Sequence, residues 1–238
     1  MSKLRVLDLF SGIGGFSLGL ELTGGFETVA FCEIDPRAQA VLRAQWPGVP
    51  VLDDVTDADF FEVQADVITA GFPCQDISVA GKGAGLAGSR SGLFRHVVRA
   101  IRVVRPAIAL LENVAALLNR GMGEVLGELA EVGYDAEWDC IPAAAVGLPH
   151  GRDRVWIAAY RDGLRELQPR WGIGDERGWV GDRREAVDWV LSRGGVLRSA
   201  DGIPAGLDRI GLCGNAVVPQ IPELIGRAIL VAEGRAAA

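Results

Sequence analysis

Cys74 lies where a nucleophile would be useful. It follows Pro73 in the segment Gly-Phe-Pro-Cys-Gln, directly after the apolar run Val67–Gly71. Proline restricts the backbone, and a loop after a strand end exposes a thiolate to the ligand crevice of a sheet. The alternative is a small buried hydrophobic residue, which is our interpretation of the other three cysteines. Those are Cys32, Cys140 and Cys213.

Glu112 is the second candidate for chemistry. It ends the apolar stretch Pro106–Leu111 and is followed by Asn113 and Val114. A carboxylate in such a place is costly unless it is paired or functional. Partial desolvation would raise its pKa and let it donate a proton. Taken alone, the segment fits better an acidic residue that caps the N-terminus of a following helix.

A glycine-rich turn, Ser11-Gly12-Ile13-Gly14-Gly15, separates a strand-like segment from a helical one. Glycines let a ligand approach the backbone, and a helix N-terminus offers free N–H groups. The spacing is not that of the G-x-G-x-x-G dinucleotide motif. Glu33 ends the next strand and is placed to bind ribose hydroxyls, and Asp54 is placed to hold an adenine amino group. These features favour a nucleoside cofactor, against the alternative of a structural turn with incidental acids.

Strands and helices alternate around these residues. Strands are predicted at Arg5–Leu9, Glu27–Glu33, Val49–Leu52, Val67–Gly71, Pro106–Leu111, Asp135–Ile141 and Arg154–Tyr160. Helices are predicted at Phe16–Leu22, Pro36–Gln45, Leu93–Val104 and Pro219–Ala232, and up to Val132 with breaks at Gly121 and Gly123. This order predicts an α/β fold with a Rossmann-like doubly wound, mostly parallel sheet whose last two strands form an antiparallel edge pair. The loops at 10–15, 72–92 and 112–114 then share the ligand-binding edge.

Composition indicates one sizeable core with a small appendage. The chain has 238 residues, 49% of them hydrophobic, and a net charge of −7. That charge disfavours an indiscriminate nucleic-acid binder, but residues 1–80 carry 4 basic and 12 acidic groups while residues 81–238 carry 20 and 19. Arginine outnumbers lysine throughout, which suits phosphate and guanine contacts but also a GC-rich genome. We expect no membrane segment, signal peptide, metal site or disulfide, and a cytoplasmic location.

Five motifs in order resemble the cytosine-C5 DNA methyltransferases. They are D-L-F-S-G-I-G-G-F from Asp8, G-F-P-C-Q from Gly71, E-N-V from Glu112, G-L-P-H-G-R-D-R from Gly147 and G-N-A-V-V-P from Gly214. The match covers residues 4–160 and 211–232. It implies a catalytic S-adenosylmethionine-binding domain at 1–160 plus 211–238, interrupted by an abbreviated target-recognition region at 161–210. Such short members resemble those carried by phages and prophages.

The resemblance implies a role for each matching residue. The catalytic residues would be Cys74, Glu112, Arg152 and Arg154. The S-adenosylmethionine site would comprise Phe10, Ser11, Gly12, Ile13, Gly14, Glu33, Ile34, Asp54, Val55, Pro73, Asn215, Ala216 and Val217. The loop after Cys74 would close on DNA through Ser78, Lys82 and Arg90.

The implied reaction methylates a cytosine that has been flipped out of double-stranded DNA. Cys74 would add to C6 while Glu112 protonates N3, oriented by Arg154. The activated ring would take the methyl group at C5, and loss of the C5 proton, to a water molecule, would expel Cys74. Covalent addition is needed because C5 of an aromatic cytosine is a poor nucleophile.

The chain departs from the family in two places. His150 stands where the family usually has Gln, and a downstream block with Arg, Thr, Glu and Arg-Leu is not found. Residues 161–210 are either a tryptophan minicore or a miniature recognition module, whose DNA contacts would come from Arg177, Arg183, Arg184 or Arg193. A short module would give short or relaxed specificity, or need an accessory or dimer partner.

Two other functions stay open at the level of sequence. The first is methylation of cytosine in tRNA or other RNA, which some members of the family perform. The second is a non-catalytic regulatory homologue, which retention of Cys74, Glu112 and Arg154 disfavours.

Overall fold

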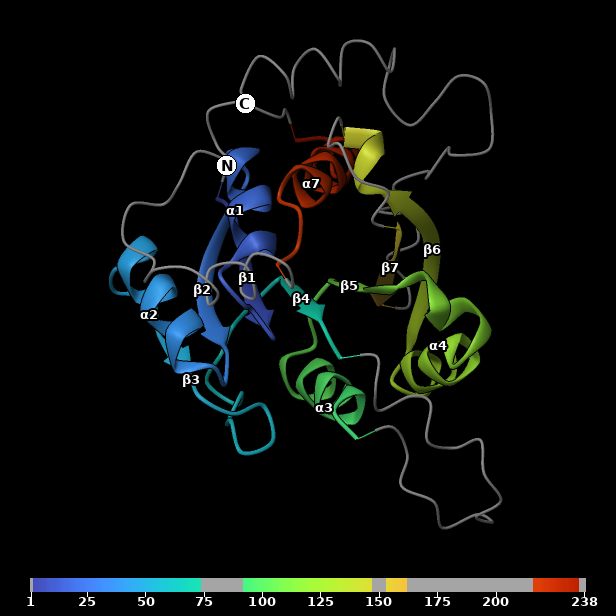
Figure 1. Cartoon of the computed structure of the whole chain (residues 1–238), viewed down its shortest axis with the longest axis horizontal. Coiled ribbons are helices and arrows are strands. Elements are labelled where there is room, and N and C mark those ends of the chain that lie inside the picture. Colours follow the sequence, from blue (N-terminus) through green and yellow to red (C-terminus); the bar gives the residue numbers. More distant parts are fainter. Residues whose placement is uncertain (1, 74–91, 147–152, 162–215, 236–238) are drawn as a thin grey trace.

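The computed structural model describes residues 2–73, 92–146, 153–161 and 216–235. This part of the chain forms a seven-stranded sheet with helices on both faces, as Figure 1 shows. The predicted α/β class with a doubly wound sheet is therefore confirmed. The predicted recognition region at 161–210 lies, apart from Arg161, outside the described residues.

The sheet has the strand order β3-β2-β1-β4-β5-β7-β6. Its strands are β1 (Leu4–Leu9), β2 (Phe26–Cys32), β3 (Val51–Leu52), β4 (Val67–Gly71), β5 (Ile108–Val114), β6 (Tyr134–Pro142) and β7 (Asp153–Arg161). The first five are parallel, and β7 runs antiparallel to both of its neighbours, β5 and β6. The order along the sheet reverses at β1 and β4, so their carboxyl ends mark the crevice where such folds bind ligands.

Two helical layers cover the sheet. In Figure 1, α1 (Gly15–Leu22) and α7 (Gln220–Ala232) lie side by side on one face, and α3 (Phe94–Val104) and α4 (Met122–Glu131) cover the other. The helix α2 (Pro36–Gln45) flanks β2 and β3, and Asp35 caps it by accepting the Arg37 N–H at 2.9 Å. The short 3-10 helices η3 (Ala115–Asn119) and η4 (Ala143–Val146) follow β5 and β6.

Strand alternation decides which side chains can meet. In β5, Ile108 and Leu110 pack in the core under α1 and α7, whereas Ala109 and Leu111 pack in the core under α3 and α4. Because successive side chains in a strand point to opposite faces, Glu112 belongs to the α1 and α7 face. The fold therefore turns this acid toward the same face as the glycine-rich turn.

Most element boundaries differ from the sequence prediction by a residue or two, and three of the differences have a clear physical cause. Strand β5 continues through Val114, because it pairs with β7 up to Val114 opposite Arg154, so residues 112–114 are strand and not loop. Gly123 lies inside α4 and does not break it; only Gly121, at φ 136°, precedes the helix. Strand β3 is limited to two residues, since Pro50 just before it has no N–H for a ladder.

Candidate active site

The turn after β1 has three residues with a positive φ. Phe10, Gly12 and Gly14 have φ values of 52°, 54° and 85°, all in the left-handed region. The Ser11 hydroxyl secures the turn by donating to the Asp8 carbonyl at 2.6 Å and accepting the Cys32 N–H at 3.3 Å. A side chain at Gly12 would meet nothing within 4 Å. The turn therefore presents bare backbone to open space, as close approach of a ligand requires.

Glu33 follows β2 and faces this turn. Its two carboxylate oxygens accept the N–H of Gly12 at 2.7 Å and the N–H of Asp35 at 2.8 Å. These bonds fix the carboxylate at the strand end, and each oxygen has a further lone pair for a ligand hydroxyl. The next residue, Ile34, is 68% exposed, which is unusual for a large apolar side chain and leaves an apolar surface beside the acid.

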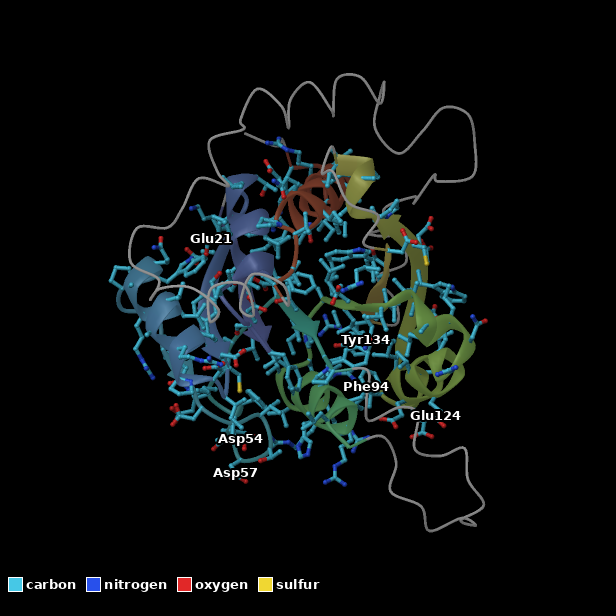
Figure 2. All side chains as sticks on the ribbon, in the orientation of Figure 1. Glu21, Asp54, Asp57, Phe94, Glu124 and Tyr134 are labelled. Carbon is cyan, nitrogen blue, oxygen red and sulfur yellow. The ribbon has the colours of Figure 1, made fainter. Side chains whose placement is uncertain are left out.

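Asp54 and Val55 lie on the loop that follows β3. Val55 is buried, while one carboxylate oxygen of Asp54 accepts the Thr56 N–H at 2.8 Å. That hydrogen bond is the main reason why the pKa of Asp54 is lowered. Figure 2 shows Asp54 with Asp57 on this loop, which in Figure 1 lies beside α3. Asp54 is thus an ionised acceptor at the edge predicted to take the adenine.

The sequence analysis did not assign a role to a buried acid beneath the turn. Asp8 is fully buried in β1, and its two carboxylate oxygens accept the hydroxyls of Thr69 in β4 at 2.7 Å and Ser17 in α1 at 2.8 Å. Burial raises the pKa of Asp8 to about 7, although both hydroxyls and the Ser17 backbone N–H lower it. Since Gly14 at the N-cap has no side chain, Asp8 supplies the capping acceptor from the neighbouring strand.

Trp46 is a second residue that the sequence analysis missed. A Cβ at Gly14 would lie 2.6 Å from two carbon atoms of its ring, so glycine is required there for contact as well as for φ. The indole N–H donates to Glu21 of α1 at 2.8 Å, and the ring packs edge-on against Phe31 with centroids 5.1 Å apart. Trp46 therefore packs against Gly14 and stabilises the turn.

The C-terminal segment packs against the start of α1 and the end of β4, and the predicted role of Val217 in the cofactor site stays a prediction. Side chains at Gly15 and Gly19 would collide with the backbone carbonyls of Val217 and Pro219, respectively. A Cβ at Gly71 would lie 3.6 Å from the side chain of Val217 and 3.6 Å from Glu112 Oε2. The end of β4 thus joins the glycine-rich turn, the C-terminal segment and Glu112. Ala216 is half-buried next to this segment.

Glu112 forms an ion pair across the antiparallel strands. Arg154 Nε lies 2.9 Å from Glu112 Oε1, and the two side chains are 22% and 10% exposed. Glu112 lies within β5 and not at a helix N-cap, so the capping alternative is wrong. The acid is buried and paired, as a functional carboxylate in an apolar strand must be. A raised pKa of Glu112 stays a prediction.

Asn113 ties this strand to the loop that carries the predicted nucleophile. Its side-chain N–H donates to the Phe72 carbonyl at 3.0 Å, and its oxygen accepts the Val114 N–H at 2.8 Å. Phe72 also packs against Phe94, the first residue of α3, with ring centroids 4.8 Å apart. The backbone is therefore fixed up to Pro73, which is exposed.

Several predicted site residues lie outside the described residues. They are Cys74, Ser78, Lys82, Arg90, Arg152 and Asn215, and His150, the departure from the family, lies outside them too. Among the described residues, no group of three or more His, Cys, Asp or Glu side chains is arranged to hold a metal ion. No helix in the described ranges is both long and apolar enough to cross a membrane.

Comparison with known proteins agrees with this arrangement. The family described as C-5 cytosine-specific DNA methylase matches residues 4–175. Type II methyltransferase M2.BsuMI of Bacillus subtilis is 42% identical over 164 residues, which cover 66% of this chain and 42% of that protein. Type II methyltransferase M.NlaX of Neisseria lactamica is 31% identical over 214 residues, which cover 85% of this chain and 68% of that protein.

A solved structure supports the fold independently. The methyltransferase EhMeth of Entamoeba histolytica aligns with a TM-score of 0.64 over 97% of this chain and 99% of that one, at 11% identity. The curated relatives have a higher sequence identity than this structure, but the chain spans less than half the length of M2.BsuMI. Because the family match covers most of the chain and M.NlaX is 31% identical over most of both proteins, the chain belongs to the C-5 cytosine-specific DNA methylase family.

Proposed function

We propose that the protein is a DNA (cytosine-5-)-methyltransferase. The observation that carries the proposal is the ion pair between the buried Glu112 and the half-buried Arg154, beside Gly71 at the strand edge that also holds the glycine-rich turn. An acid fixed in this way has one oxygen held by the arginine and a second oxygen directed to the end of β4. Membership of a family described as C-5 cytosine-specific DNA methylase supports DNA as the substrate.

The residues at the turn fit S-adenosylmethionine as the cofactor. When bound, this cofactor supplies an electrophilic methyl group on a sulfonium. Open space above Gly12 would admit it to the backbone, Glu33 would accept its ribose hydroxyls, and Ile34 would cover the adenine. Asp54 would accept from the adenine amino group. The remaining contacts would come from Phe10, Ser11, Ile13, Gly14, Val55, Pro73, Asn215, Ala216 and Val217.

Catalysis would depend on three side chains around the target base. The Cys74 thiolate forms a bond to C6, and Glu112 gives its proton to N3, so that the ring becomes an enamine nucleophilic at C5. After methylation, C5 loses its proton to water, the C6–S bond breaks, N3 returns its proton to Glu112, and the thiolate is restored. Arg154 holds Glu112 in reach of the base. Arg152 belongs to the same motif, and we propose that it also contacts the base or its phosphate.

The proposed substrate is double-stranded DNA with the target cytosine flipped out. Neither C5 nor C6 is well placed for attack within a stacked duplex. Ser78, Lys82 and Arg90 would contact DNA after Cys74, and residues 161–210 would read the sequence, alone or with a partner. DNA in a bacterial or phage-infected cell is cytoplasmic, so this substrate also implies that location.

Methylome sequencing tests the proposal directly. The chain is expressed in a host without cytosine methylation, alongside Cys74→Ala and the control Cys140→Ala on β6. Wild type and Cys140→Ala are expected to mark cytosines in a short motif, and Cys74→Ala none. Absence of marks on DNA from all three, with marks on RNA by bisulfite sequencing, would overturn the proposal in favour of an RNA methyltransferase.

A further inference from the structure

Arg99 lies on α3, and its guanidinium is surrounded by the loop after β3. The nitrogen Nη2 donates to the carbonyls of Val55 at 2.6 Å and Ala58 at 3.1 Å, and lies 3.4 Å from the carbonyl of Thr56. Three carbonyls of one four-residue segment therefore converge on a single donor group. No regular strand or helix fixes this segment; Val55 and Ala58 pack on the core, and the arginine supplies the hydrogen bonds that tie the carbonyls of the segment to α3.

An aromatic ring holds the guanidinium in place. Its central carbon lies 5.3 Å from the ring centroid of Phe60, and Phe60 itself is 2% exposed in the core. The planar guanidinium can stack on this ring and donate sideways to carbonyls at the same time. A lysine ammonium on a shorter stem offers neither the plane nor the same reach.

The loop held by Arg99 carries the acid proposed to read the adenine. Asp54 directly precedes Val55, and its own carbonyl accepts the Ala58 N–H at 2.8 Å, so residues 54–58 form one compact turn. The position of the Asp54 carboxylate then depends on the turn that Arg99 closes.

We propose that Arg99 is a positioning residue for the adenine end of the cofactor site, acting through the turn at residues 54–58. This inference rests on the proposed function, because it takes an adenine nucleoside as the ligand. Arg99 is not expected to touch the ligand. It sets how well the site distinguishes an adenine from a purine that lacks the 6-amino group.

Calorimetry with two ligands tests this role. S-adenosylhomocysteine has the 6-amino group, whereas S-inosylhomocysteine has a carbonyl oxygen in its place. Loss of a hydrogen bond to a carboxylate predicts that the wild type prefers the first ligand about tenfold or more. In Arg99→Lys we expect the preference to fall to about twofold, with S-adenosylhomocysteine bound about tenfold more weakly. The matched control is Arg102→Lys, an exposed arginine on the same helix, which is expected to bind as wild type does.

Two further variants separate positioning from loss of folding. Phe60→Leu keeps the arginine but removes the ring, and is expected to reduce the preference in the same direction by a smaller factor. Combining Arg99→Lys with Asp54→Asn is expected to reduce the preference no further than Asp54→Asn alone, since both act on one contact. An unchanged preference in Arg99→Lys overturns the inference, and additive losses in the double variant do so too. Failure of the wild type to bind either ligand would instead count against the proposed function.

Discussion

The proposed cofactor side and the proposed catalytic side of this site are stabilised in different ways. On the proposed cofactor side, several hydrogen bonds link β1, β2, β4 and α1. They are made by the side chains of Ser11, Glu33 and Asp8. On the proposed catalytic side, Glu112 forms an ion pair with Arg154, and the Asn113 amide donates to the Phe72 carbonyl, so two neighbouring side chains of β5 hold the groups that would act on the base. Single changes should therefore abolish the rate on the catalytic side, but only weaken binding on the cofactor side.

Glu112→Gln should give the largest effect and sharpen this contrast most. The amide has nearly the same shape but cannot give a proton to N3, so the methylation rate should fall about 10³-fold. Single-turnover methylation measures the rate, and calorimetry should show cofactor affinity within about twofold of wild type. Glu124→Gln, an exposed acid on α4 labelled in Figure 2, is the control. An equal loss of cofactor binding in Glu112→Gln would break the comparison.

Asp8→Asn should show how much the buried carboxyl group on the proposed cofactor side lowers the unfolding free energy as the pH rises. A folded pKa of about 7 against an ordinary 3.8 means that the folded state holds its proton more tightly. The stability that this proton contributes is fully present below pH 3.8 and lost as pH rises through about 7, a change of up to ~4 kcal/mol. The asparagine variant lacks this titration, so its unfolding free energy should rise relative to wild type between pH 4 and pH 8.

Urea denaturation of the two proteins at several pH values measures this difference. Asp57→Asn, an exposed aspartate on the loop after β3, is the matched control and should follow the wild type. Parallel curves for Asp8→Asn and wild type would show that the carboxylate is stabilised by its hydroxyl partners more fully than its burial implies.

Arg154→Met should leave Glu112 buried without its cation. The expected loss is about 10² in rate, because the acid is no longer held in one orientation, with ~2 kcal/mol of unfolding free energy. A double-mutant cycle with Glu112→Gln measured by single-turnover kinetics should be strongly non-additive. Additive losses would mean that the two side chains act separately.

Gly14→Ala should give the smallest effect, and one limited to the cofactor side. The methyl group would need a φ of 85° and would lie 2.6 Å from the Trp46 ring, so cofactor affinity should fall about tenfold with little change in rate at saturation. Gly48→Ala separates the two causes, since Gly48 has a φ of 90° but nothing within 4 Å of the added carbon. It should lose ~1 kcal/mol of stability and keep full cofactor affinity.

Local patterns in the sequence predicted much of the fold. The bounds of Pro36–Gln45 and Val67–Gly71 agree with the structure, because a proline at the first helical position and an apolar run before Gly71 are local signals. The errors arose where pairing overrides local preference, as at Glu112–Val114, which β7 extends into strand. Cys74, Arg152 and the DNA contacts stay predictions, because those residues lie outside the described ranges.

The site was harder to predict where its hydrogen bonds join residues that are far apart in the sequence. Arg99 reaches carbonyls more than 40 residues earlier, and Trp46 reaches Glu21 across 25 residues. No spacing rule links such pairs. Asp8 is different: it interrupts an apolar strand as Glu112 does, so the same reasoning about buried acids would have found it.

The contact between α1 and the segment at Val217 and Pro219 has a consequence for the timing of activity during synthesis. Gly15 and Gly19 contact carbonyls that lie some 200 residues later in the chain, so one wall of the proposed cofactor pocket is synthesised long after the glycine-rich turn. While a ribosome is still translating, the apolar side chains Phe16 and Leu20 lack the helix that covers them. We therefore expect a nascent chain to bind no nucleoside until α7 has emerged, so the synthesis of α7 sets the time at which the proposed cofactor can first bind.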